Sequence, residues 1–541
     1  MKRLLSAAEI FIIIILAIAP IFASFPYRIN IFLSWEGAYR MSEGQLPYKD
    51  FGIPVGYMYW VIPSIFFKIF GAQLITLVKA QAFINIMAGL AFRSIAKNLH
   101  IHAPIRFAAI IVFCLSYSFI NYWPWYNHTV IVFQLISLAF LLKFITGSVS
   151  RFYYGWLVLS AVFVFFSFFT KQDAGALALI ICLVLLAYDA WYEKRWKPVL
   201  VFITSFIITG VLCILPFTNQ RFGYWFNHGQ FPHTSRISIG DILGQFLGNS
   251  NWLKFYLFVI VCLLVFTIRD FKTLFQNKIS TIFILLTLGI LAEAAIFQVT
   301  SYVPEDNNIF FHSFAILFIL SALATRLPIP ENSWKSVIIL AGGTLLWWSQ
   351  AYYKYIDRFI FSKQAKAYEY QVHEGYSYAT TVDRNTFMIE LDTTDVPMEQ
   401  WRVPNLKSFE KILLPGPTVD GIERLMQLDI VKNNPSLKLL NMTELTPLAA
   451  EVPFELETGN NYPLWFHKGV GMFQKETDMF NNRIQNDHYD LVLYEYIPYL
   501  NNFYPYSIRE SLQAHYQLID RFPAPRKPSS HAWIEVYRKQ P

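Results

Sequence analysis

Two carboxylates, Glu36 and Asp50, lie in a polar stretch that directly follows the first hydrophobic run of this chain. Charge so close to hydrocarbon costs a few kcal/mol unless water solvates it or it has a chemical task. A carboxylate held at the edge of a membrane can serve as a general base. Residues 34–63 are therefore predicted to form an active-site loop where the membrane meets water. The alternatives are a solvated surface acid for Glu36 and a turn or helix-capping carboxylate for Asp50.

The composition places these carboxylates in an integral membrane protein. Of 541 residues, 55% are hydrophobic and only 15% are charged, and the mean hydropathy is +0.36. Soluble domains carry roughly a quarter charged residues. The net charge of +7 is modest, and the basic residues lie mostly between hydrophobic runs, as topology signals do. We therefore expect the lipid bilayer as a partner and no nucleic acid.

Eleven hydrophobic segments are predicted to span the membrane, each close to the ~20 residues that a helix needs. They are 7–25, 73–92, 106–122, 129–147, 154–170, 174–191, 199–217, 252–268, 279–298, 309–325 and 336–352. Segment 55–70 is also apolar but carries Pro63 and Lys68. It is predicted to lie at the outer surface, because counting it as a span would invert the charge pattern of the connections that follow.

Basic residues mark alternate connections between the spans, which sets the expected orientation. They are Arg93, Lys97, Arg106, Arg151, Lys194, Arg195, Lys197, Arg269, Lys272, Lys278, Arg326 and Lys335. By the positive-inside rule these connections are cytoplasmic. The N-terminus, which begins an uncleaved first helix, is then cytoplasmic, and the C-terminal region is extracytoplasmic, or periplasmic in a bacterial inner membrane.

The composition changes at about Tyr353, where a polar region of almost two hundred residues begins. Predicted strands at 385–391, 410–414, 489–494 and 532–538 alternate with predicted helices at 420–433 and 507–519. Such alternation favours a small α/β domain. The expected fold class is thus an α-helical polytopic membrane protein with about 11 transmembrane helices and a C-terminal extracytoplasmic α/β domain. The expected domains are 1–352, with a first outer loop at 26–72, and 353–541.

The first outer loop resembles the catalytic loop of the GT-C glycosyltransferases, polytopic enzymes that use polyprenyl-phosphate-linked sugars. Three pieces carry the resemblance: Trp35-Glu36-Gly37-Ala38-Tyr39, the turn from Gly44 to Phe51, and the apolar segment from Pro54 to Phe70-Gly71. The similarity is to the branch with protein mannosyltransferases and lipid A aminoarabinose transferases. It covers roughly residues 1–350. The first acid of that family is usually aspartate, and Glu36 supplies the same chemistry with one more methylene.

The resemblance implies an inverting transferase that moves a sugar from a polyprenyl-phosphate carrier to an acceptor at the outer face of the cytoplasmic membrane. Glu36 would take the acceptor's proton, and Asp50 would orient the acceptor, bind a cation or hold the loop. The acceptor could be a lipid, a glycan or a protein. A divalent cation could assist, although the sequence contains no clear metal-binding motif.

The departing phosphate needs cations and hydrogen-bond donors on the same side of the membrane. The candidates are Lys171, Gln172, Arg221, His228 and His312. Lys171-Gln172 matches the Lys-Gln or Lys-Gly-Pro of many relatives, but a snorkelling lysine at a helix end would look the same. A histidine hydrogen-bonded to a neighbouring helix is the alternative for His312.

Other functional classes remain open at this point. A polysaccharide polymerase or ligase would also act on lipid-linked glycans, but such enzymes place functional residues in a large late loop. A lipid-linked glycan flippase or transporter would carry polar residues near mid-membrane and inverted repeats. The C-terminal region could cap the cavity or select the acceptor. Residues such as Trp465 and His467 would either form a sugar-binding surface or belong to an ordinary α/β domain.

Overall fold

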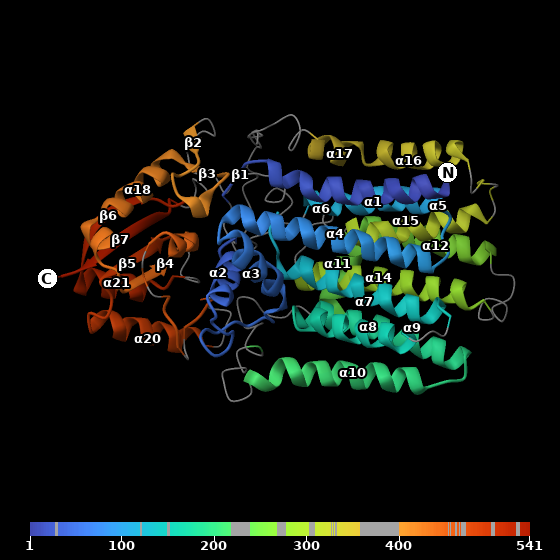
Figure 1. Ribbon diagram of the computed structural model, residues 1–541, viewed down its shortest axis with the longest axis horizontal. Helices are drawn as coiled ribbons and strands as arrows, with labels where there is room; N and C mark the ends of the chain where they lie inside the picture. Colours follow the sequence, from blue (N-terminus) through green and yellow to red (C-terminus); the bar gives the residue numbers. More distant parts are fainter. Residues whose placement is uncertain are drawn as a thin grey trace.

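A computed structural model describes most of the chain. Residues 28–30, 120–121, 149–151, 218–224, 226–238, 268–276, 302–308, 326, 328, 331–332, 357–395, 397–399, 453, 455, 460–461, 465, 467–471, 499–503, 526–530 and 541 lie outside the described part. The described residues form a bundle of long helices with a smaller sheet-containing domain at one end (Figure 1). The chain starts at the bundle end that lies away from this C-terminal domain.

Each of the eleven predicted spans contains a helix. These helices are α1 (Lys2–Ile18), α4 (Leu74–Asn98), α5 (Ala103–Cys114), α7 (Tyr126–Thr146), α8 (Tyr153–Phe168), α9 (Gln172–Tyr192), α10 (Lys197–Ile214), α12 (Asn251–Thr267), α14 (Lys278–Ser301), α15 (Ile309–Ala324) and α16 (Trp334–Trp347). Six helical segments in the described part are long and apolar enough to cross a membrane, and a bent pair of α11 (Ile239–Asn249) and α12 forms a further candidate. Several other helices are apolar but shorter. The chain is a multi-pass membrane protein, as predicted.

The apolar segment after the first loop forms α3 (Met58–Phe70), a helix of 13 residues. At 1.5 Å per residue it is about 20 Å long, too short for a hydrocarbon core of about 30 Å. It packs against α2 (Ile31–Ser42), and both lie at the bundle end that faces the C-terminal domain (Figure 1). This placement agrees with the prediction that 55–70 does not span.

Buried ion pairs join the helices near the other end of the bundle. Glu9 on α1 is fully buried and accepts hydrogen bonds from Arg93 and Arg106, each at 2.8 Å. Asp189 on α9, also fully buried, pairs with Lys278 on α14 at 2.6 Å. A buried charge is tolerated only where a partner of opposite sign compensates it. These pairs therefore tie α1, α4 and α5 together, and α9 to α14.

The C-terminal domain contains a four-stranded sheet in the order β4-β5-β7-β6. Its strands are β4 (Leu439–Met442), β5 (Leu491–Tyr496), β6 (Tyr516–Pro523) and β7 (Trp533–Lys539), and its helices include α18 (Gly416–Gln427), α19 (Asp429–Asn433), α20 (Phe473–Gln485) and α21 (Tyr506–His515). Only β4 and β5 pair in parallel; β7 is antiparallel to both of its neighbours. The α/β class of this domain is confirmed.

The predicted helix 507–519 is wrong at its end, because α21 stops at His515 and β6 begins at Tyr516. The β6 segment pairs with β7 over its length, and this pairing outweighs the helical pattern of its own residues. The predicted strand 385–391 lies outside the described residues. The predicted domain boundary between residues 352 and 353 falls within α17 (Ser349–Ile356), and residues 357–395, which follow this helix, lie outside the described part.

A second, three-stranded sheet connects the two halves of the molecule. Its order is β1-β3-β2, with β1 (Phe25–Pro26), β2 (Trp401–Arg402) and β3 (Ile412–Pro415). Strand β1 follows the first span directly and pairs in parallel with β3 of the C-terminal region. Tyr27 continues this contact, because its amide donates to the carbonyl of Leu413 at 2.8 Å. The C-terminal domain is thus attached beside the start of the first outer loop.

Candidate active site

Helix α2 carries Glu36 and is held by close packing against α3. The indole Nε1 of Trp60 donates to the carbonyl of Leu33 at 2.9 Å. A Cβ atom on Gly37 would lie 2.0 Å from the Trp60 ring, so only glycine allows the two helices to approach this closely. The glycine beside the acid thus has a clear structural reason, which is to fix the position of α2 against α3.

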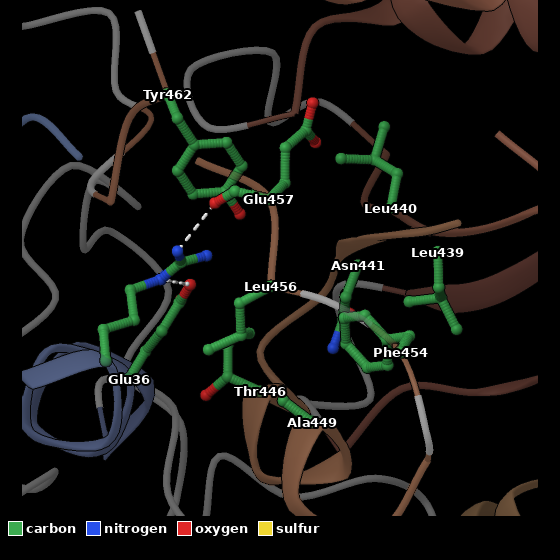
Figure 2. A pocket seen from close by; sticks show the side chains of 11 residues that line it. Glu36, Leu439, Leu440, Asn441, Thr446, Ala449, Phe454, Leu456, Glu457 and Tyr462 are labelled. Carbon is green, nitrogen blue, oxygen red and sulfur yellow. Dashed lines mark hydrogen bonds and ion pairs between the residues drawn. The ribbon is translucent and has the colours of Figure 1, made fainter. Parts of the chain in front are cut away.

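Glu36 forms an ion pair with Arg40, one helical turn later on α2. The Arg40 Nε lies 2.9 Å from Oε1 of Glu36, and the two side chains are only 1% and 12% exposed. Arg40 also donates through Nη1 to the side-chain oxygen of Gln45 at 2.9 Å and to the carbonyl of Glu457 at 2.7 Å. Its guanidinium lies over the Tyr462 ring, 4.5 Å from the centroid. Figure 2 shows Glu36, Glu457 and Tyr462 around one pocket, which Arg40 also lines.

Burial and the arginine act on the Glu36 carboxyl in opposite directions. Loss of hydration raises the pKa of Glu36, while the charge and hydrogen bond of Arg40 lower it by a smaller amount, so the net shift is upward. Burial, with the nearby Glu36 charge as the next contribution, raises the pKa of Tyr462 to about 12. The Glu36 carboxylate is therefore more basic than an exposed glutamate, which suits a group that must accept a proton.

Asp50 closes a turn in the loop that follows α2. Its Oδ2 accepts a hydrogen bond from the amide of Leu46 at 2.7 Å, and its own amide donates back to the Leu46 carbonyl at 2.9 Å. Within this turn Tyr48 has a φ of +66°, a conformation that costs free energy unless the surroundings hold it. Among the roles predicted for Asp50, these contacts favour holding the loop.

The outer loop docks on one segment of the C-terminal domain. The carbonyl of Asp50 accepts from the amide of Gly459 at 3.0 Å. Gly52 donates to the carbonyl of Tyr462 at 2.8 Å and accepts from the amide of Leu464 at 3.0 Å. These backbone contacts form a small parallel bridge between the two halves. Together with the Arg40–Glu457 contact, they place the C-terminal domain directly over Glu36.

Lys171 and Gln172 lie at the start of α9, next to the same outer loop. The Lys171 ammonium is 3.0 Å from Oδ2 of Asp173 and faces the Phe297 ring at 5.2 Å from its centroid. Gln172 donates through Nε2 to the carbonyl of Trp225 at 2.8 Å and reaches the carbonyl of Pro54 at 3.4 Å. Gln172 thus connects α9 to the outer loop.

His312 lies on α15 and faces α12. Its Nδ1 is 3.0 Å from the hydroxyl of Tyr256, and its ring stacks on Trp252 with 4.2 Å between centroids. This contact matches the alternative given above for His312, a histidine that is hydrogen-bonded to a neighbouring helix. The Phe297 ring, which Lys171 faces, lies 6.0 Å from that of Phe311, the residue before His312. Lys171 and His312 therefore belong to the same end of the bundle.

Several predicted residues lie outside the described part of the chain. Arg221 and His228, predicted to line the donor phosphate site, are among them, as are Trp465 and His467 of the C-terminal domain. Within the described residues, no group of three or more histidine, cysteine, aspartate or glutamate side chains could hold a metal ion. The predicted assistance by a divalent cation stays a prediction.

Arg40 is the main residue that the sequence analysis missed. Its spacing of four from Glu36 could have revealed it, because residues at i and i+4 on a helix are neighbours and an acid–base pair there is favourable. Glu457 and Tyr462 carry no comparable local signal. The Arg40–Glu457 contact joins positions 417 residues apart, so only the folded chain reveals it.

Comparisons with known proteins identify the fold. No family model and no curated protein matches this chain. ArnT from Cupriavidus metallidurans in the apo state is similar in structure, with 11% sequence identity, a TM-score of 0.50, and coverage of 99% of this chain and 97% of that one. ArnT from the same organism bound to undecaprenyl phosphate matches at 10% identity, the same coverage and a TM-score of 0.46.

The apo-state similarity extends over nearly the whole chain. The chain therefore has a fold similar to that of ArnT, which agrees with the resemblance stated for the first outer loop. The sequence resemblance covered only the membrane half, whereas the structural similarity also includes the C-terminal domain.

Proposed function

We propose that this protein is an inverting GT-C glycosyltransferase that moves a sugar from a polyprenyl-phosphate carrier to an acceptor hydroxyl at the outer face of the cytoplasmic membrane. One observation carries the proposal: Glu36, a nearly buried carboxylate with a raised pKa, lies where the GT-C-like bundle meets the C-terminal domain. A basic group at this edge can meet both a lipid carrier that enters from the bilayer and an acceptor that arrives from water.

In the proposed reaction Glu36 begins as the carboxylate. It takes the proton of the acceptor hydroxyl while the hydroxyl oxygen forms a bond to the anomeric carbon. The bond between that carbon and the phosphate oxygen breaks on the opposite face of the sugar, and its electron pair leaves with the polyprenyl phosphate. Configuration at the anomeric carbon is inverted, and the phosphate needs no proton to leave. Arg40 limits the rise in the Glu36 pKa, which keeps the ionised base populated.

Lys171 is the first choice for a group that meets the donor phosphate. It lies at the loop end of the bundle, 8% exposed, with its ammonium beside Asp173. A fixed cation near the leaving group stabilises the negative charge that develops there. Gln172, His312, Arg221 and His228 remain further candidates for the same site. Asp50 is proposed to support the reaction by holding the loop.

The proposed orientation follows the distribution of basic residues. Arg93 and Arg106, in a connection predicted to be cytoplasmic, pair with Glu9 near the bundle end away from the C-terminal domain. The positive-inside rule then puts the N-terminus in the cytoplasm and the C-terminal domain outside.

A donor-cleavage assay tests the proposal against its rivals. Full-length protein in native membranes is given radiolabelled polyprenyl-phosphate-linked sugars, and both free polyprenyl phosphate and labelled product are measured. We expect one polyprenyl phosphate to be released for each sugar transferred, with the anomeric configuration inverted. Movement of intact donor across the bilayer without cleavage would instead show a flippase. Growth of a lipid-linked glycan by many units would show a polymerase, and either result would overturn the proposal.

A further inference from the structure

The C-terminal domain covers the proposed base in this structure. Glu36 lines a pocket between α2 and that domain, with Glu457 and Tyr462 in the same wall (Figure 2). The free space in the pocket holds about one water molecule, and the Glu36 side chain is only 12% exposed. An acceptor must bring its hydroxyl within hydrogen-bond distance of the base to lose its proton. A sugar, a lipid headgroup or a protein side chain is too large to do so through this pocket.

One edge of the C-terminal domain closes over Glu36, and we call it the α2 edge. Its residues each form a hydrogen bond with α2 or the outer loop, and they are Ala449, Glu457, Gly459, Tyr462 and Leu464. In every one of these bonds the α2 edge contributes a backbone amide or carbonyl. Water replaces the lost partner when such a bond breaks at a surface, so the net contribution of each bond to stability is small. The α2 edge can therefore separate from α2 at modest cost.

A second attachment of the same domain, through β1, is apolar. Strand β1 pairs with β3, and Phe25, Ile412 and Leu414 of these strands are buried. The buried ring of Tyr27 adds to this contact, with its centroid 6.3 Å from that of Phe409. Separating these residues would return apolar surface to water, which is unfavourable in proportion to the area exposed. The β1 attachment is therefore expected to hold when the α2 edge separates.

We propose that the α2 edge is a gate over the active site, that this structure shows its closed state, and that the acceptor reaches Glu36 when the edge separates from α2 while β1 stays paired with β3. The inference rests on the proposed function, because it takes Glu36 as the base. Arg40 retains Glu36 and Gln45 as partners when its bond to Glu457 breaks, so opening uncovers the base without leaving it unpaired. A closed gate also keeps water from the reaction site, which protects a bound donor from hydrolysis.

A reversible crosslink across the gate tests this inference. Gly52 of the outer loop and Pro463 of the α2 edge pair in a β-bridge. Paired strands lie about 4.8 Å apart, within the separation of about 4.4–6.8 Å that a disulfide allows between Cα atoms. The full-length Gly52→Cys/Pro463→Cys protein is oxidised in native membranes with copper phenanthroline, and sugar transfer is measured before oxidation, after it, and after reduction by dithiothreitol. We expect transfer by the crosslinked protein to fall at least about tenfold, as for a locked lid, and to return on reduction.

Pro26→Cys/Leu413→Cys is the matched control, because these two residues pair in parallel across β1 and β3. A disulfide there fixes the attachment that stays closed, so oxidation should leave transfer unchanged. Oxidised wild type controls for the four native cysteines. Full transfer by crosslinked Gly52→Cys/Pro463→Cys, or an equal loss in both crosslinked pairs, would overturn the inference.

Hydrogen exchange of the wild type tests the gate without donor or acceptor. The amides of Gly52, Gly459 and Leu464 are hydrogen-bonded across the gate, and those of Phe25 and Tyr27 across the β1 attachment. Peptides with the gate amides should exchange at least about tenfold faster, because local opening exposes them while the β1 attachment stays closed. Equal exchange at the two attachments would overturn the inference. A wild type that cleaves no donor would refute the proposed function, whereas full transfer through a crosslinked gate would refute the gate alone.

Discussion

Arg40 donates from Nε to Oε1 of Glu36 over 2.9 Å, and the same guanidinium donates to the carbonyl of Glu457 in the C-terminal domain. One side chain therefore joins the proposed base to the domain that covers it. The position of Glu36 depends on the contacts of Glu457, Gly459, Tyr462 and Leu464 with the outer loop as much as on α2 itself. The C-terminal domain is thus part of the active site in this account, and its removal would disturb the base directly.

Removing Arg40 should destabilise the protein and leave Glu36, the proposed base, without its ion-pair partner. In Arg40→Met the Glu36 carboxylate stays buried without its partner, and breaking a buried ion pair typically costs about 3–5 kcal/mol. We expect a matching loss in the free energy of unfolding of the detergent-solubilised protein. Lys49→Met is the control, since Lys49 is an exposed cation on the same loop. Equal stability of the two variants would show that the pair contributes nothing.

The pH dependence of transfer should report the raised pKa of Glu36. Burial raises this pKa from its ordinary value of 4.5 despite Arg40, so the base becomes protonated at a higher pH than an exposed glutamate would. Transfer should then fall on the acidic side with a midpoint above 4.5. Because the folded state holds this proton more tightly, the contribution of Glu36 to stability is full at low pH and is lost as pH rises through the folded pKa. Rate measurements across pH on the wild type would check this, and a midpoint at or below the ordinary value would contradict it.

Asp50→Asn should be a mild variant. The side-chain oxygen of the introduced asparagine can still accept the hydrogen bond from the amide of Leu46, so the turn weakens but does not open. We expect the transfer rate to fall by less than about tenfold, the equivalent of one weakened hydrogen bond. The comparison is with Glu43→Gln, an exposed acid near the end of α2. A loss of a hundredfold or more in Asp50→Asn would assign a chemical role to Asp50.

Lys171→Met should weaken use of the donor more than the chemical step. A hydrogen bond to a charged group contributes about 1.5–3 kcal/mol, so the donor KM should rise roughly 10- to 100-fold. Lys68→Met, an exposed lysine at the end of α3, supplies the control. Steady-state rates at varied donor concentration separate the two effects. An unchanged donor KM in Lys171→Met would remove Lys171 from the phosphate site.

The membrane half was largely predictable because its signals are local. Each segment predicted from hydropathy over about 20 residues contains a helix. Segment 55–70 was set apart by its proline and lysine and by the charge pattern of the connections, and it forms the short helix α3. Strand β7 was predicted from its own alternating residues almost to the residue. A two-residue strand such as β1 leaves no such pattern, since its partner β3 lies almost four hundred residues later.

The candidate site was only partly predictable for the same reason. Glu36 stands out because charge is rare next to a span, but the lining of its pocket comes from distant parts of the chain. Long-range contacts of this kind are set by how two domains fit together, which local periodicity does not encode.

The transfer rate of Glu36→Gln, compared with Glu43→Gln at matched expression and insertion, tests the central claim most directly. The amide keeps the shape of the side chain but cannot accept the proton, and loss of a general base typically lowers rates about 10²- to 10⁴-fold. We expect a loss of that size in Glu36→Gln, wild-type transfer in Glu43→Gln, and partial activity in Glu36→Asp. Wild-type transfer by folded Glu36→Gln would contradict the account, because the proposed base would then have no part in the reaction.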